Sequence, residues 1–278
     1  MTEVSPIFVI TELTGISADK IVLHEDGGFL SRGYVIGDGE IVFKFPKQDF
    51  VKYDNEANIV NFMNTRNFGV NLQRVKWLDK NYRYIGFYGV KGKPLSNVAS
   101  QLTKSQKENI GEQIGLFLKK LHSCTPQNAI LKPSSHLEIN TWQQRFASQK
   151  DFFKKYFTAK EIKQISKVLA DKINILNQLG EKLVFCHRDI RNGNLFLDDR
   201  GKIGIIDFDC AGYYDEANDF LLIEDEYILE YMMDSYGASE TLRNKIKHRR
   251  EAYLIACADI VHYQEKNDEF AKRIKSMI

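Results

Sequence analysis

Residues 187–194 read His187-Arg188-Asp189-Ile190-Arg191-Asn192-Gly193-Asn194, and a second acidic stretch, Ile205-Ile206-Asp207-Phe208, follows shortly afterwards. The two stretches place an Asp, an Asn and a further Asp in a fixed order. In such a set one carboxylate can orient an attacking hydroxyl group, while the amide and the other carboxylate hold a magnesium ion that bridges nucleotide phosphates. The alternative, an ordinary polar loop beside a core strand, would explain either stretch alone but not both together. The pair therefore predicts phosphate-transfer chemistry.

The spacing and surroundings of these residues support that prediction. His-Arg-Asp followed five residues after the Asp by Asn is the H-R-D-x-x-x-x-N loop of protein kinases. The apolar runs 194–197 and 203–206, separated by the turn cluster 198–201, predict a β-hairpin. Asn194 begins the first strand of this hairpin and Asp207 follows the second. Because the two strands run antiparallel, both residues come to the same end of the hairpin. Two oxygen ligands there, with room for water and phosphate oxygens, suit Mg²⁺.

Length and composition define the general class. At 278 residues and a formal net charge of +2, the chain has the make-up of a soluble globular protein large enough for two lobes. The apolar run 6–10 is too short for a secretory signal, and no apolar stretch is long enough to span a bilayer. We therefore expect a cytoplasmic protein, a monomer or weak dimer, that binds neither membrane nor nucleic acid. Its widely spaced cysteines predict reduced thiols and no metal site or disulfide framework: Cys124, Cys186, Cys210 and Cys257.

A lysine for the phosphates is expected upstream of the hairpin. Residues 40–46 predict a strand with Phe43 and Phe45 on one face and Lys44 on the other. A lone lysine in such a strand usually faces solvent, but the downstream motifs favour a position in a cleft. Lys44 is thus the candidate for the contact with the α- and β-phosphates.

The partner of this lysine is expected on the next helix. Residues 53–63 carry a helical apolar stripe, and Glu56 lies at its margin, where it can turn towards the sheet. Asp54 is the competitor. It falls in the first helical turn, where an acid serves as a cap or complements the helix dipole. We therefore favour Glu56.

A glycine-containing stretch, 27–35, precedes the Lys44 strand and predicts a loop over the nucleotide. It fits the kinase pattern G-x-G-x-x-G-x-V at Gly28, Gly33 and Val35, but Leu30 replaces the middle glycine. The backbone from Gly28 to Ser31 would approach phosphate oxygens, and Val35 would cover the purine. An ordinary hairpin turn is the alternative.

The lobes are expected to join along 84–95, where an apolar strand passes into a Gly/Pro-containing segment. Backbone groups from Tyr88 to Val90 would then bond the purine edge; an ordinary strand and turn is the alternative. We predict an N-terminal nucleotide-binding lobe over 1–90 and a C-terminal catalytic and substrate-binding lobe over 91–278, with 91–95 as linker.

Helical patterns dominate the second lobe. Thr103 and Gln106 form a capping box before a helix whose apolar face runs to Leu121. His122, at its end, is interpreted as a capping or packing residue. Residues 159–178 repeat the helical pattern, and 182–186 predict a short strand that leads into the catalytic loop.

The chain resembles the aminoglycoside phosphotransferase and choline-kinase-like family, and more closely the aminoglycoside 2″-phosphotransferases. The resemblance is carried by 41–47, 90–95, 187–194 and 205–220, in family order through most of the chain. Unlike true protein kinases, the chain has no long activation loop and no Ala-Pro-Glu after Asp207.

The resemblance implies an α+β, bilobal protein-kinase-like fold that uses ATP or GTP with Mg²⁺. It implies Asp189 as the base or hydroxyl-orienting residue, Asn194 and Asp207 as magnesium ligands, Lys44 as the phosphate lysine and Asp219 as a structural support of the catalytic loop. Arg191 coincides with the lysine of the protein-kinase loop. It would touch the γ-phosphate or would be a surface arginine.

The acceptor is expected to carry ammonium groups, which need charge-assisted partners. Glu224, Asp225 and Glu226 follow the catalytic segment and resemble the acidic cluster of the aminoglycoside branch, although a solvated helix face is the alternative. The basic run 243–250 is expected to face solvent, where it would repel a cationic substrate or attract a phosphorylated one.

These features predict a magnesium-dependent transfer of the γ-phosphate to a hydroxyl group of a small molecule, with an aminoglycoside favoured and antibiotic resistance as the role. A kinase of another hydroxyl compound, such as choline, homoserine, methylthioribose or a sugar, is the alternative acceptor class. A nucleotide-binding pseudokinase or scaffold is the alternative of another class. It is disfavoured because a pure binder does not need Asp189.

Overall fold

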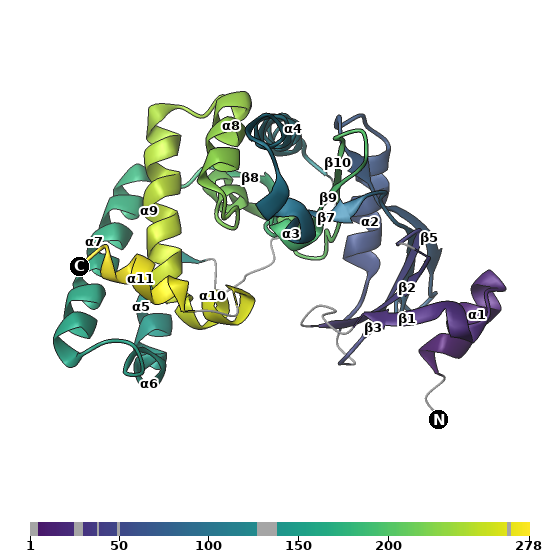
Figure 1. Cartoon of the computed structure of the whole chain (residues 1–278), viewed down its shortest axis with the longest axis horizontal. Helices are drawn as coiled ribbons and strands as arrows, with labels where there is room; N and C mark the ends of the chain where they lie inside the picture. Colours follow the sequence, from purple (N-terminus) through teal and green to yellow (C-terminus); the bar gives the residue numbers. More distant parts are fainter. Residues whose placement is uncertain (1–4, 25–29, 38, 49–50, 127–137, 266–267) are drawn as a thin grey trace.

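The computed structural model describes residues 5–24, 30–37, 39–48, 51–126, 138–265 and 268–278, without the side chains of 264 and 265. Its N-terminal part is built on an antiparallel sheet in the order β1-β2-β3-β6-β5 (Figure 1). Helix α1 (Pro6–Thr14) and the turn η1 (Ala18–Lys20) precede this sheet, and α2 (Asp54–Asn64) lies between β3 and β5 in the chain. The strands of the sheet are β1 (Ile21–His24), β2 (Ser31–Ile36), β3 (Ile41–Pro46), β5 (Arg74–Leu78) and β6 (Ile85–Tyr88).

A second sheet connects the two parts of the chain. Its order is β4-β10-β9-β7, and β4 pairs with β10 in parallel. The predicted hairpin is confirmed as the antiparallel pair of β9 and β10. Strands β8 and β11 pair with each other in a separate two-stranded sheet. The strands are β4 (Asn71–Leu72), β7 (Lys93–Pro94), β8 (Leu183–Cys186), β9 (Leu195–Leu197), β10 (Ile203–Ile205) and β11 (Gly212–Asp215).

The C-terminal part is mainly helical, which confirms the α+β, two-part architecture expected from the sequence (Figure 1). The predicted capping box of Thr103 and Gln106 forms at the start of α4. The structure adds a second one at the start of α7, where Thr158 and Glu161 make the same reciprocal bonds. The helices are α3 (Leu95–Val98), α4 (Lys104–His122), α5 (Ile139–Ser148), α6 (Lys150–Phe153), α7 (Ala159–Leu179), α8 (Glu226–Tyr236), α9 (Glu240–Ala256), α10 (Ala258–Glu265) and α11 (Glu269–Lys275), with 3₁₀ turns η2 (Ala99–Gln101), η3 (Asn192–Asn194) and η4 (Glu216–Phe220).

Apolar packing unites the parts. One cluster of buried side chains runs from α2 through β6 and α4 to the hairpin and α8, so helices of the C-terminal part share a core with α2. A second cluster joins α5, α7 and α9 to α11. A third lies on the far face of the N-terminal sheet, around Phe43 and Phe45. The lobe boundary at residue 90 stays a prediction, because β4 precedes that residue and yet pairs with β10. Within the described residues, no helix is long and apolar enough to cross a membrane.

Two glycines let α4 and α8 approach closely. A Cβ atom on Gly111 would lie 2.5 Å from the carbonyl oxygen of Ile228. One on Gly115 would lie 2.3 Å from the carbonyl oxygen of Met232. Real Cβ atoms do not come so near to backbone, so only glycine permits this spacing. The contact matters for the site because α4 also supports the β9–β10 hairpin.

We expect Gly115→Ala to lower the free energy of unfolding by about 2 kcal/mol, since overpacking outweighs the higher helix propensity of alanine. Chemical denaturation followed by circular dichroism measures the change. The control is Leu116→Ala, whose side chain is 43% exposed on the same helix; its effect should stay within about 0.5 kcal/mol. Equal effects in the two variants would contradict the packing argument.

Candidate active site

Lys44 lies between two carboxylates, as a result of strand alternation. Phe43 and Phe45 point into the apolar cluster on the far face of β3, so Lys44 points to the near face. There its Nζ lies 2.7 Å from Oε1 of Glu56 on α2 and 2.6 Å from Oδ1 of Asp207 after β10. The predicted Lys44–Glu56 pair is therefore present. The structure adds the contact with Asp207.

Burial and mutual attraction set the charges of this triad. Burial raises the pKa of Glu56 to about 7, against the attraction of Lys44, and the nearby carboxylates of Asp207 and Asp209 add to the rise. Burial would also raise the pKa of Asp207, but the ammonium group of Lys44 outweighs it and holds that pKa below its ordinary value. Burial opposes the charge of Lys44, yet the two carboxylates raise its pKa well above its usual range. Lys44 and Asp207 therefore stay charged at neutral pH.

Asp189 and Asn194 contact each other within the catalytic loop. The amide nitrogen Nδ2 of Asn194 donates to the backbone oxygen of Asp189 at 3.0 Å and to its Oδ2 at 2.7 Å. Arg191 lies on the other side, with Nε 3.1 Å from Oδ1 of Asp189. Burial raises the pKa of Asp189, with Arg191 opposing and Asp207 reinforcing the rise. Arg191 is thus a neighbour of the candidate base; a contact with the γ-phosphate stays a prediction.

Asp219 supports the loop as expected. Its carboxylate accepts hydrogen bonds from the backbone N–H groups of His187 and Arg188, and it lies 3.0 Å from Nε2 of His122. Arg188 has a positive φ of 72°, which is unusual for a residue with a side chain, and its guanidinium group lies 3.5 Å from the ring centre of Tyr214. Asp219 therefore holds a strained turn in place. The two ring nitrogens of His122 are hydrogen-bonded to Asp219 and to the hydroxyl of Tyr236. Its interpretation as a capping or packing residue stays a prediction.

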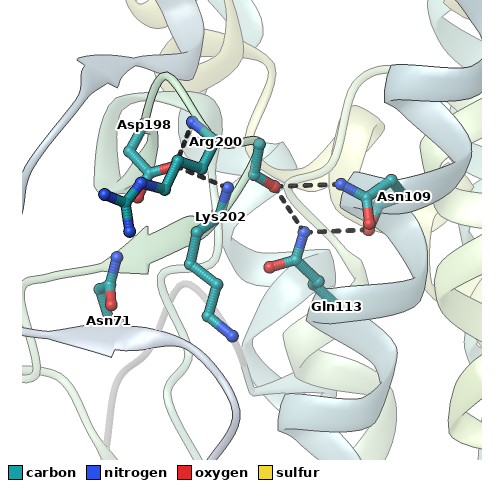
Figure 2. A pocket seen from close by; sticks show the side chains of 7 residues that line it. Asn71, Asn109, Gln113, Asp198, Arg200 and Lys202 are labelled. Atoms are coloured by element: carbon teal, nitrogen blue, oxygen red, sulfur yellow. Dashed lines mark hydrogen bonds between the residues drawn. The ribbon is translucent and has the colours of Figure 1, made fainter.

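The hairpin brings the two candidate metal ligands together. The N–H of Ile206 donates to the backbone oxygen of Asn194 at 3.1 Å, immediately before Asp207. Helix α4 fixes the other end of this hairpin (Figure 2). Gln113 donates to the carbonyl of Gly201 at 2.8 Å and accepts from the N–H of Ile203 at 3.0 Å. The hairpin is therefore held at both ends.

A polar hollow of about 510 Å³ lies beside this anchor, at the turn of the hairpin (Figure 2). It is separate from the Lys44 triad, and its polar groups serve the turn itself. Asp198, for example, accepts from the N–H groups of Arg200 and Lys202. The lining residues are Asn71, Asn109, Gln113, Asp198, Arg200, Gly201 and Lys202.

The predicted nucleotide contacts lie around the near face of the sheet. Val35 pairs with Val42 in register, so its side chain shares the face of Lys44. The hydroxyl of Ser31 accepts a hydrogen bond from that of Tyr53 at 2.9 Å, which ties β2 to the start of α2. Gly28 falls outside the described residues. The roles of these residues towards a nucleotide stay predictions.

The connection after β6 is closely packed. The ring of Tyr88 contacts that of Trp77, which belongs to the far-face cluster, so only its backbone borders the near face. The N–H of Gly89 donates to the carbonyl of Glu40 at 2.9 Å. Val90 is buried, and its side chain would be 2.9 Å from a Cβ atom on Gly204. Backbone bonds from this segment to a purine stay a prediction.

The acidic residues predicted for the substrate flank the start of α8. Asp225 caps the helix by accepting from the N–H groups of Tyr227 and Ile228, and it pairs with Lys107 at 2.7 Å. Glu226 pairs with Arg250, and Glu224 is exposed. Asp225 and Glu226 therefore already hold cations of the chain, and the charge of Glu224 also acts on Arg250. Their substrate role stays a prediction.

The expectation that the basic run 243–250 faces solvent is wrong for part of it. Lys245 and Arg249 are 5% and 2% exposed, because this face of α9 packs against η4. Lys245 pairs with the buried Asp215 at 3.0 Å, and Nε of Arg249 donates to the side chain of Asn218 at 2.9 Å. Arg250 donates to the carbonyl of Ile223 at 2.6 Å. These cations anchor the segment that carries Asp219.

Sequence reasoning missed two residues near the triad. The charge of Asp209 acts on Lys44, Glu56 and Asp189, so it belongs to the same electrostatic environment. The sequence could have indicated Asp209, because it is the second acid of the Asp-Phe-Asp sequence at 207–209. Gln73 is buried and contacts both Glu56 and Asp207. No local pattern indicated it.

This fold with this arrangement of side chains defines a protein-kinase-like phosphotransferase. Residues 24–227 match the model of the family described as the phosphotransferase enzyme family. That match covers most of the chain, and the protein belongs to this family.

A curated relative agrees with that assignment. An ethanolamine kinase of Saccharomyces cerevisiae is 28% identical over 152 residues, which are 50% of this chain and 27% of the yeast protein. The chain thus spans about a quarter of that curated relative.

Solved structures show the same fold. A GDP and kanamycin complex of an APH(2″) enzyme has a TM-score of 0.72 at 16% identity, over 97% of this chain and 95% of that one. A choline kinase from Streptococcus pneumoniae has a TM-score of 0.60 at 13% identity, over 97% and 95%.

We expect Lys245→Met to lower the free energy of unfolding by about 3 kcal/mol, because it removes the nearer cation of the buried Asp215, at 3.0 Å, and leaves only Arg249, at 4.0 Å. Lys247→Met, at an exposed position of the same helix, should change it by less than about 0.5 kcal/mol. Denaturant titration of both variants measures the difference. An equally small loss in both would show that the ion pair with Asp215 contributes little to stability.

Proposed function

We propose that the protein transfers the γ-phosphate of ATP or GTP to a hydroxyl group of a small molecule, in a reaction that requires Mg²⁺. The observation that carries this proposal is the meeting of Lys44, Glu56 and Asp207 from three separate segments, next to a loop in which Asn194 holds Asp189. A purely structural ion pair would not need this second, hydroxyl-directed carboxylate.

Asp189 would act on the acceptor. Its carboxylate accepts a hydrogen bond from the acceptor hydroxyl and orients the oxygen towards the γ-phosphorus. As the new P–O bond forms, the bond to the β-phosphate oxygen breaks and the hydroxyl proton passes to Asp189. The raised pKa of Asp189 makes it a better proton acceptor than an ordinary aspartate. Arg191, 3.1 Å from this carboxylate, would help to balance the charge nearby.

The residues present suit a magnesium ion. Both contacts of the Asn194 side chain with Asp189 use Nδ2, so Oδ1 is the end that would face a cation. Asp207 is kept ionised by Lys44. An amide oxygen and a carboxylate are ligands that Mg²⁺ accepts together with water and phosphate oxygens. When bound, the ion neutralises charge on the phosphates.

Lys44 would bind the α- and β-phosphates, held in place by Glu56. Its present contact with Asp207 would then be shared with the incoming phosphates. The predicted loop residues Gly28 and Ser31 would contribute backbone contacts, while Val35 and the backbone from Tyr88 to Val90 would hold the purine.

For the acceptor, we propose an aminoglycoside, and with it a role in antibiotic resistance. The exposed acidic residues after the catalytic segment, Glu224 and Glu226, support an acceptor with ammonium groups. The fold shared with an enzyme solved with kanamycin is consistent with this choice. One observation favours a second candidate, an amino alcohol, because the relative with 28% identity is an ethanolamine kinase. Both candidates combine a hydroxyl group with a cationic nitrogen.

We expect Asp207→Ala to remove magnesium-dependent nucleotide binding, whereas Asp189→Ala keeps it and loses transfer. The reason is the division between a metal ligand and a hydroxyl partner. Calorimetric titration with MgADP and MgGDP, combined with transfer assays on ATP and GTP, measures both properties. Equal loss of nucleotide affinity in the two variants would overturn the assigned roles.

We expect Glu224→Gln and Glu226→Gln to lower kcat/KM for kanamycin-type and gentamicin-type acceptors by about 1.5- to 5-fold each, as is usual for exposed charge pairs. Raised salt should shrink the effect. Asp225→Asn should have the same effect on kcat/KM, and it leaves α8 intact because asparagine also caps a helix. Nucleotide affinity and any turnover of a neutral polyol are the controls and should not change. Turnover of ethanolamine or choline without turnover of any aminoglycoside would replace the first acceptor by the second.

A further inference from the structure

Gln73 lies at the junction of the two sheets. It follows β4, which pairs in parallel with β10, and precedes β5 of the N-terminal sheet. The register sets Leu72 beside Ile205, so the next residue, Gln73, comes level with the end of β10. Its backbone oxygen accepts from Asn64 of α2 at 2.8 Å. Gln73 is therefore attached to both sheets and to α2.

The side chain of Gln73 is 4% exposed and joins two members of the triad. Its Nε2 donates to Oε1 of Glu56 at 3.3 Å, and its Oε1 accepts from the backbone N–H of Asp207 at 3.3 Å. One planar amide thus spans from the acid that holds Lys44 to the main chain of the predicted metal ligand.

The two groups that the Gln73 amide contacts, Glu56 and the backbone of Asp207, both depend on neighbouring contacts to keep their conformation. Asp207 has a positive φ of 70°, a conformation that residues with side chains seldom adopt and that neighbouring contacts must hold. Glu56 receives both Lys44 and Gln73 at Oε1, while its buried Oε2 has no hydrogen-bond partner among the described residues. The orientation of the Glu56 carboxylate therefore depends on the hydrogen bonds of Oε1, which come from Lys44 and Gln73.

We propose that Gln73 is a positioning residue that fixes Glu56 and Asp207 relative to each other when nucleotide binds. This inference rests on the proposed function. Lys44 joins the same two carboxylates directly in the structure. Phosphates that take up its ammonium group weaken this link. The bridge through Gln73 uses the backbone N–H of Asp207, which is not a ligand group, so it persists in the loaded site.

The test compares Gln73→Met with Gln149→Met, a matched control in the helical part. Gln149 is also buried, and its amide also spans two groups, the carbonyl of Ala256 at 2.7 Å and the N–H of Asp259 at 3.2 Å. Both changes remove a buried bridging amide at similar volume and should cost similar stability. At a temperature where both variants are folded, Gln73→Met should bind MgADP or MgGDP about tenfold more weakly than the parent, and Gln149→Met as tightly as the parent.

Hydrogen exchange followed by NMR gives a readout without nucleotide. The amide proton of Asp207 should be protected in the parent and in Gln149→Met, and should exchange faster in Gln73→Met. If Gln73→Met does not fold, Gln73→Glu takes its place. At a pH at which both acids are ionised, this variant keeps an acceptor for Asp207 and sets a carboxylate against Glu56 in place of the donor. It should therefore weaken MgADP binding while the amide of Asp207 stays protected.

The outcomes separate the inference from the proposed function. Equal MgADP and MgGDP affinity of the parent and the Gln73 variants, in a parent that binds nucleotide, overturns the role of Gln73 alone. An unprotected Asp207 amide in the parent does the same. If the amide of Asp207 is protected in the parent but the parent binds neither MgADP nor MgGDP, the proposed function is overturned. The role of Gln73 is then overturned with it.

Discussion

The site depends on one buried lysine held between two carboxylates. Lys44, Glu56 and Asp207 belong to β3, α2 and the end of β10, and their charges meet at 2.6–2.7 Å. Desolvation makes each isolated charge costly, so the three groups stabilise one another only when all are in place. Burial raises the pKa of Glu56 to about 7 although Lys44 lies beside it. The triad thus ties a sheet, a helix and a hairpin from distant parts of the chain to one point.

A second layer of polar contacts keeps the catalytic loop in position. Asp219 accepts from the backbone of His187 and Arg188, and the segment that carries it is held in turn by Lys245 and Arg249 of α9. The basic face of α9 therefore serves the fold, since the buried carboxylate of Asp215, just before η4, needs a cation and the buried amide of Asn218, within η4, needs a donor. The anchor extends from the C-terminal helices to the loop that carries Asp189.

Family membership and geometry limit the chemistry without choosing the acceptor. The chain belongs to the phosphotransferase enzyme family, and its fold is shared by enzymes whose structures hold kanamycin or whose name specifies choline. The side chains proposed to bind the acceptor lie outside the triad. Of the acids expected to do so, Asp225 and Glu226 are engaged by Lys107 and Arg250. Under the proposed function, a substrate cation would have to compete with these cations of the chain itself.

Local patterns in the sequence determined much of this protein. Alternation placed Lys44 opposite Phe43 and Phe45, helical periodicity placed Glu56 towards the sheet, and two apolar runs around a turn predicted the hairpin. Each of these predictions concerns residues that are close in the chain, and the spacing of their apolar side chains indicates the local structure. The position of Gln73 between Glu56 and Asp207, the burial of Lys245 and the partners of Glu226 were decided only by the tertiary structure. Their contacts join residues far apart in the chain, and a polar side chain carries no local signal of whether folding will bring a partner to it.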